Sequence, residues 1–204
     1  MHELREAGLL GISELSSIEA FKFEGSEMAG YHPSKVRWAV TLADPQLLLN
    51  DIEQTASDRS SWPPHWSDAV KDMWFDIALA ESKEFYRYCA AERGLPESGA
   101  TSTDAMLRNL LRSFSVAQCY RIIWAGAKEA SDFLVRKKST RPHAANYMIG
   151  SCQRWADKAR AENWDVAHYK RNFNLPRSSI SYVFFDVFLK TGDAGFNDVN
   201  RPGF

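Results

Sequence analysis

The chain has 204 residues, with 25 Lys and Arg, 26 Asp and Glu, five His and a formal net charge of −1; 45% of its residues are hydrophobic and 25% are charged. This composition excludes collagen-like, intrinsically disordered and disulfide-scaffold proteins, and a chain of this length can bury a sizeable core. The sequence starts Met-His-Glu-Leu-Arg-Glu, without a positively charged start and apolar run, and its three cysteines include no Cys-x-x-Cys pair. We therefore expect a cytoplasmic protein with no membrane partner.

Residues 1–60 predict an N-terminal segment with short helices and a small β element. Residues 36–42 alternate apolar with polar or small side chains, and this period of two is typical of a half-buried strand. Phe21 and Phe23 predict a partner strand, with residues 25–33 as the connection between the two strands.

Residues 61–192 predict the main domain, which is helical, and residues 193–204 predict a tail. Apolar side chains recur at helical spacing in several long segments, separated by Gly, Pro and polar turns. The fold expected is a mainly α, single bundle-like domain of six or seven helices. The longest helix is expected over residues 65–93. The last helix is expected from about residue 176, with a buried stripe made of Ile180, Val183, Phe184, Val187 and Phe188.

Charge is divided unevenly along the chain. Residues 1–100 hold 17 acidic and nine basic side chains, whereas residues 101–190 hold seven acidic and 15 basic ones. A basic half within a near-neutral chain indicates a surface for nucleic acid or for an acidic protein partner. Electrostatic packing of the two halves against each other accounts for the same asymmetry.

Residues 165–190 resemble a bacterial helix-turn-helix segment. Asn174 to Ser181 is similar to the turn and the start of the second helix, with Phe173, Leu175, Ile180 and Val183 as the inner positions. Lys170 stands where that pattern carries a small residue. In this motif the second helix enters the major groove, where Arg pairs with guanine and Ser contacts base or phosphate. The resemblance implies nucleic-acid contacts from Lys170, Arg171, Arg177, Ser178, Ser181 and Tyr182. A loop followed by a helix that closes the bundle is the alternative.

A basic turn carries Arg136 and His143, separated by six residues. This spacing resembles the Arg-x(4–6)-His signature of the HEPN ribonucleases, which are all-helical and often belong to toxin or phage-defence systems. The resemblance implies that Arg136 and His143 are catalytic, because His can move a proton near neutral pH and Arg can stabilise a charged phosphate. A solvated turn in front of a helix is the alternative.

Two carboxylates, Glu81 and Glu84, lie on the apolar side of the helix expected over residues 65–93. A carboxylate that faces a core needs a partner, because an isolated buried charge is costly. We expect a structural ion pair, for which three arginines are candidates: Arg108, Arg112 and Arg121.

Seven tryptophans distinguish the chain from an average sequence. Trp74 and Trp124 fall at core spacing. Trp62, Trp66 and Trp164 lie near helix ends and are candidates for a protein interface or a homo-oligomer contact, because Trp often anchors interfaces.

The five histidines show no metal-ligand spacing, and the common phosphate-binding, dinucleotide-binding, serine hydrolase and zinc protease motifs are missing from the sequence. We therefore expect no metal and no cofactor. The first interpretation is a non-catalytic binding or regulatory protein, prokaryotic in style, whose basic half contacts nucleic acid or an acidic partner. The alternatives are a HEPN-like ribonuclease and a protein-binding, immunity or assembly module that acts through the Trp-rich acidic half.

Overall fold

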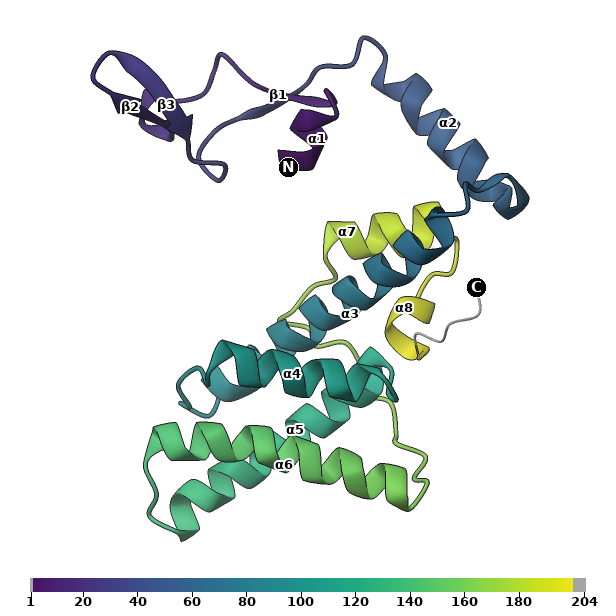
Figure 1. The fold of residues 1–204 in the computed structure, drawn as a ribbon. Coiled ribbons are helices and arrows are strands. Elements are labelled where there is room, and N and C mark those ends of the chain that lie inside the picture. Colours follow the sequence, from purple (N-terminus) through teal and green to yellow (C-terminus); the bar gives the residue numbers. More distant parts are fainter. Residues whose placement is uncertain (1, 200–204) are drawn as a thin grey trace. The chain divides into compact units, whose positions relative to one another are not determined.

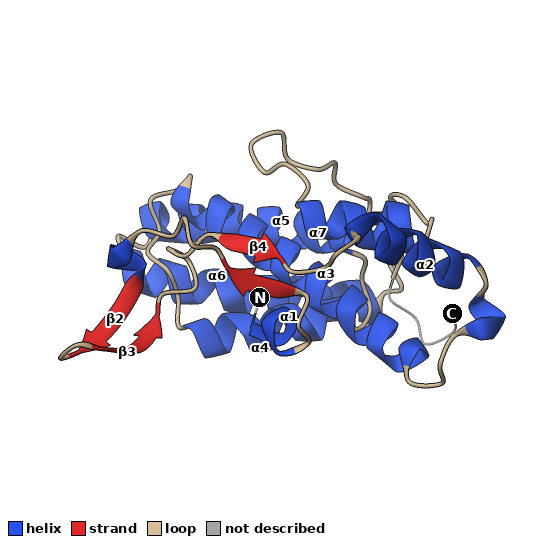
Figure 2. Cartoon of the chain, turned by 90° about the horizontal axis from the view of Figure 1, so that it is seen from above, coloured by secondary structure: helices blue, strands red, loops and turns tan. Residues whose placement is uncertain are grey.

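The computed structural model describes residues 2–199, and the chain divides into two compact units, Met1–Gln54 and Thr55–Phe204. The division falls inside helix α2 (Pro45–Ser57). Helices account for most of the described residues, which confirms the mainly α class (Figure 1). The strands all lie between residues 10 and 40 of the part described, within the first unit (Figure 2).

The first unit contains α1 (His2–Glu6), a 3-10 turn (Ile18–Ala20) and four short strands: β1 (Leu10–Ile12), β2 (Phe21–Glu24), β3 (Glu27–Tyr31) and β4 (Trp38–Val40). The strands expected near Phe21 and near Trp38 both form, but their predicted pairing is wrong. β2 pairs with β3 across the two-residue turn Gly25-Ser26, and β4 pairs with β1. Gly25 has a φ of 66°, which suits a tight hairpin turn, so the chain turns back inside the stretch expected to be a connection.

The second unit contains four long helices and a shorter helical ending. Three helices are capped by a side-chain oxygen that accepts a hydrogen bond from a backbone N–H in the first turn. Asp44 caps α2 in this way, and Ser115 and Thr140 cap two of the long helices. The elements are a 3-10 turn (Arg59–Ser61), α3 (Trp66–Ala91), α4 (Ala100–Leu111), α5 (Val116–Arg136), α6 (Arg141–Ala161), α7 (Ser179–Tyr182), the π-helix η3 (Val183–Phe188) and α8 (Ala194–Asn197).

Helices α5 and α6 form an antiparallel hairpin that is held at close range by small residues. A Cβ added at Gly126 of α5 would collide with Cys152 Sγ of α6, so only glycine fits there. Ala145, Ala156 and Ala159 are buried on α6, where small side chains let the two helices approach closely. The hairpin therefore has a tightly packed interior.

Residues 164–199, which we call the return segment, run back from α6 to α3 (Figure 1). The segment supplies Phe185 and Phe196 to the core, where Phe185 meets Trp74 of α3 edge-on at 5.0 Å and Phe196 meets Tyr120 of α5 at 5.2 Å. Part of the stretch expected as a tail therefore forms α8 and is packed. Residues 200–204 of that tail lie outside the described residues.

The predicted buried stripe of the last helix is wrong by about one position. Ile180 and Val183 are more than half exposed, whereas Ser181, Phe185 and Leu189 are buried. The π-helix begins only at Val183, so it does not account for the exposure of Ile180 in α7. From Val183 onward its i→i+5 hydrogen bonds replace the i→i+4 bonds on which the predicted spacing depends.

Candidate functional site

The helix-turn-helix arrangement expected for residues 165–190 does not form. Residues 164–178, all of them described, contain no helix. Their backbone bonds to α5 instead: Tyr169 N–H donates to the Ala117 carbonyl at 3.0 Å, and the Val166 carbonyl accepts from Gln118 Nε2 at 3.1 Å. The first helix of the motif is therefore replaced by extended chain that crosses the start of α5.

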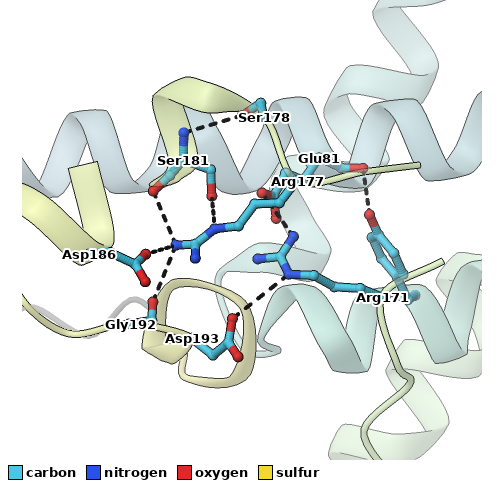
Figure 3. Close-up of polar contacts among 9 residues, drawn as sticks. Glu81, Arg171, Arg177, Ser178, Ser181, Asp186, Gly192 and Asp193 are labelled. Atoms are coloured by element: carbon cyan, nitrogen blue, oxygen red, sulfur yellow. Dashed lines mark hydrogen bonds and ion pairs between the residues drawn. The ribbon is translucent and has the colours of Figure 1, made fainter. Parts of the chain in front are cut away.

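The Arg177 side chain is partly buried and links separate parts of the return segment to one another (Figure 3). Its Nε donates to Ser181 Oγ at 3.1 Å, its Nη2 donates to the carbonyls of Ser181 and Gly192, and it forms an ion pair with Asp186. Ser178 caps α7 by accepting from Ser181 N–H at 3.2 Å. Two of the three Arg177 nitrogens that would read a guanine edge, Nε and Nη2, are thus occupied inside the protein.

Arg171 ties the return segment to α3. Its Nη1 lies 3.1 Å from Glu81 Oε1, and its Nε lies 4.0 Å from Asp193 Oδ1 (Figure 3). Its guanidinium carbon lies 4.1 Å from the centre of the Phe196 ring. Glu81 is only 8% exposed, and its backbone carbonyl accepts a hydrogen bond from Tyr120 OH at 3.3 Å. This arrangement is a structural ion pair in a largely dry environment.

The ion pair expected for the apolar side of α3 is therefore present, but its predicted partners are wrong. Glu81 pairs with Arg171, which is 90 positions further along the chain, and Glu84 is exposed. Two of the candidate arginines lie over aromatic rings instead, Arg108 over Phe75 and Arg121 over Trp124.

The six candidate nucleic-acid contacts of the return segment thus separate into two sets. Arg171, Arg177 and Ser181 have their contacts inside the protein, and Ser181 is fully buried. Lys170, Ser178 and Tyr182 are exposed, although Ser178 caps α7 and the Tyr182 ring lies 5.9 Å from the Arg177 guanidinium carbon. The structure does not assemble the six into one surface.

The turn between α5 and α6 does gather exposed charge. We call Arg136, Lys137, Lys138, Arg141 and His143 the turn cluster. Arg136 is 76% exposed and lies 3.6 Å from an Asp132 carboxylate oxygen, and Arg141 Nη1 donates to the Gly94 carbonyl at 2.9 Å. The Nδ1 atom of His143 lies 3.2 Å from Ser139 Oγ.

A surface depression of about 410 Å³ adjoins the turn cluster, and its lining residues are Glu129, Phe133, Arg136, Lys137 and Tyr147. The Phe133 and Tyr147 rings stack with centres 4.2 Å apart, and the His143 ring meets Phe133 edge-on at 5.2 Å. The two HEPN-like candidates, Arg136 and His143, are thus both next to Phe133, one through the shared depression and the other through ring contact.

Two further residues of α6 contact the lining of this depression. The Arg154 guanidinium carbon lies 4.8 Å from the centre of the Tyr147 ring, and Ser151 Oγ donates a short hydrogen bond to the Glu129 carboxylate. Glu129, Phe133, Tyr147 and Arg154 are not among the residues predicted from the sequence. Their helical spacing on either side of the basic turn could have identified them. Glu129 and Phe133 are four positions apart, and Tyr147 and Arg154 are seven positions apart, so each pair lies on one face of its helix.

The three interface candidates among the tryptophans have intramolecular contacts. Trp62 stacks on Phe188 at 5.6 Å and donates from Nε1 to the Thr55 carbonyl, and Trp66 lies 6.0 Å from Phe188. Trp164 meets Trp155 edge-on at 5.3 Å and remains 38% exposed. A partner contact through these residues stays a prediction.

The cysteines lie inside the second unit and are poor nucleophiles. Burial raises the pKa of Cys89 to about 11 and that of Cys152 to about 12 from an ordinary value of 9.0, and it also raises the pKa of Cys119. Among residues 2–199 no group of three or more His, Cys, Asp or Glu side chains is arranged to hold a metal ion. No helix of this described part has an apolar stretch long enough to cross a bilayer.

Comparison with protein families, with curated proteins and with solved structures finds no match to this chain. The geometry of the chain's own surfaces is therefore the basis for any functional assignment.

Proposed function

We propose that this protein is a non-catalytic nucleic-acid-binding protein that contacts phosphates through the turn cluster. The observation that supports the proposal is the excess of exposed cations at the α5–α6 turn. Four of the six residues 136–141 are Arg or Lys, and the only ion pair that they form among the described residues joins Arg136 to Asp132. Cations held away from acidic partners attract a polyanion most strongly.

The backbone at Lys138 supports the same proposal. Lys138 has a φ of 48°, in the left-handed region that favours glycine, and it follows directly after the end of α5. A residue with a Cβ costs about 1 kcal/mol there. A lysine at this position is therefore better explained by its charge than by its backbone preference.

The proposed binding is independent of nucleotide sequence. The cluster offers two lysines and two arginines at a turn. Residues 164–178 of the return segment contain no helix that would hold a recognition helix in a major groove. Phosphate contacts of this kind position a protein on a nucleic acid without reading its bases.

A salt titration tests the proposal. Anisotropy of a labelled single-stranded RNA, and of a labelled duplex DNA of equal length, is measured with the wild type and with Arg136→Gln/Lys137→Gln/Lys138→Gly. Removing one phosphate contact should reduce the slope of log K against log salt by about 0.7 for a single strand and about 0.9 for duplex DNA. The slope of the triple variant should therefore be smaller by about two units for the RNA and by nearly three units for the duplex DNA.

A control with the same change of charge comes from the first unit: Lys22→Gln/Lys35→Gln/Arg37→Gln, whose three side chains are also exposed. This variant should keep the wild-type slope. If the wild type shows no salt-dependent binding at low ionic strength, or if the two triple variants weaken binding equally, the proposal is wrong.

RNA cleavage at the same surface is a second candidate function, because Arg136 and His143 both adjoin Phe133. Incubation of the RNA with wild type and with His143→Ala separates the two. Cleavage that requires His143 would favour the HEPN-like function, whereas intact RNA bound equally by both proteins would favour non-catalytic binding.

A further inference from the structure

A second surface feature lies on the outer side of α3. A groove of about 680 Å³ runs between α3 and residues 178–180 of the return segment. Its apolar lining consists of Met73, Ile77, Ala80 and Ile180, of which the first three recur at i, i+4 and i+7 along α3. A stripe with this spacing is the shape against which another helix packs.

Apolar side chains around the groove are unusually exposed. Met73 and Ile180 line the groove and are 42% and 56% exposed, and Tyr182 and Val183, which follow Ile180 in the chain, are 54% and 53% exposed. Isolated exposed apolar residues are ordinary, but a row of them beside a groove marks an interaction surface.

Phe173, which belongs to the same return segment, is 98% exposed. Its turn is held in place, because Asn172 Oδ1 accepts from Asn174 N–H at 2.8 Å and Asn174 Nδ2 donates to Tyr88 OH at 3.0 Å. Tyr88 belongs to α3, so the turn that carries the exposed ring is attached to the helix that lines the groove. A fixed, fully exposed phenylalanine is typical of an anchor that fills a partner's pocket.

The charged side chains of the groove that have no ion-pair partner among the described residues are negative. Lys83 is neutralised by Asp104 at 2.6 Å, and Arg87 lies 3.3 Å from Glu97. One carboxylate of the lining, Glu81, is paired with Arg171.

Asp76 and Glu84 line the same groove and are both exposed. Neither of them forms an ion pair within residues 2–199. The groove therefore presents two free negative charges beside its apolar floor.

We propose that this groove binds an amphipathic helix of a partner protein, with apolar residues on one face and Lys or Arg beside them. The stretch of α3 from Met73 to Arg87 spans about 21 Å at helical rise, enough for about four turns of a bound helix. Apolar side chains enter between Met73, Ile77 and Ile180, and the flanking cations pair with Asp76 and Glu84. This is the helix-in-groove mode of recognition, with charge selecting the partner.

Three labelled synthetic peptides test the proposal by anisotropy. The first is an amphipathic Leu/Lys helix, the second has Glu in place of every Lys, and the third has Ser in place of every Leu. Only the Leu/Lys peptide should bind the wild-type protein, because it alone matches both the apolar floor and the free carboxylates.

Two variants test whether the peptide occupies this groove. Asp76→Lys/Glu84→Lys should weaken binding about tenfold or more, and so should Ile180→Asp. The changed side chains are exposed, so both variants should keep the wild-type circular dichroism spectrum and melting curve. The matched control Glu162→Lys/Asp165→Lys reverses two exposed charges outside the groove and should leave affinity unchanged.

Three results would overturn the proposal. One is failure of the Leu/Lys peptide to bind, and the second is equal binding of the Ser/Lys peptide, since simple counter-ion attraction would then explain the affinity. The third is an equal loss of affinity in the control and in the groove variants.

Discussion

Replacing Arg171 by Met removes the cation opposite a buried carboxylate while keeping most of the aliphatic stem. Glu81 is 8% exposed and the Arg171 side chain is 24% exposed. Loss of one partner from a fully buried pair costs about 3–5 kcal/mol, and the residual exposure here favours the low end of that range. We expect the free energy of unfolding to fall by about 3 kcal/mol, including about 0.5–1 kcal/mol from the cation–π interaction with Phe196.

Urea and thermal unfolding followed by circular dichroism measure this loss. For the second unit, Thr55–Phe204, about 3 kcal/mol corresponds to a melting temperature lower by about 6–12 °C. The double variant Arg171→Met/Glu81→Gln should recover part of the stability, because the carboxylate is then no longer left charged and unpaired.

Arg87→Met is the matched control on the surface of α3. Its pair with Glu97 is 54% and 74% exposed, so the change should cost less than about 0.5 kcal/mol. Equal losses for Arg171→Met and Arg87→Met would refute the structural role of Arg171 and would return it to the set of candidate phosphate contacts.

The remaining predictions concern the α5–α6 hairpin and the thiols. Gly126→Ala should lower the free energy of unfolding by about 2 kcal/mol, because the new Cβ collides with Cys152 Sγ. Gly150→Ala should be neutral or stabilising, because its Cβ meets only the end of a flexible arginine side chain, and melting curves of the two variants test the difference. Lys138→Gly should stabilise the protein by about 0.5–1 kcal/mol while weakening RNA binding, and a lower melting temperature would contradict the backbone argument. Burial raises the pKa of Cys89 to about 11, so the unfolded chain releases this thiol proton at a lower pH than the folded chain does. The contribution of Cys89 to the free energy of unfolding should therefore be fully present below pH 9 and should decline from pH 9 toward pH 11, as urea titrations across that range would measure. The native thiols should also react with a disulfide reagent at pH 8 far more slowly than the unfolded ones, and equal rates would show that they are accessible.

The long helices could be predicted from sequence because their apolar spacing persists over many turns. On α5, for example, apolar side chains recur at helical spacing from Val116 to Ala130, and those that define the spacing are buried: Val116, Tyr120, Ile123, Ala127 and Ala130. Strand pairing could not be predicted in the same way. Two candidate strands near Phe21 and Trp38 do not specify which of four segments pair, and the turn at Gly25 decides it.

The return segment could not be predicted because some of its apolar side chains point into the core and others point into solvent. The sequence pattern makes Phe173, Ile180 and Val183 inner positions, yet all three are more than half exposed. The π-helix changes the angular spacing, and the partner of Glu81 is 90 positions away, beyond any local pattern. The exposed turn cluster could be anticipated from charge alone, whereas the depression beside it depends on how α5 and α6 cross.

The attachment of the return segment to α3 also sets an order of events during synthesis. Glu81 and Trp74 are made long before Arg171 and Phe185 exist, so the helices α3 to α6 collapse first with an unpaired carboxylate and an uncovered tryptophan face. Closing so long a stretch is entropically costly and slow compared with local helix formation. We therefore expect a compact intermediate of the nascent chain that exposes part of its apolar core. This intermediate should bind chaperones until Arg171 has paired with Glu81 and Phe185 has packed on Trp74.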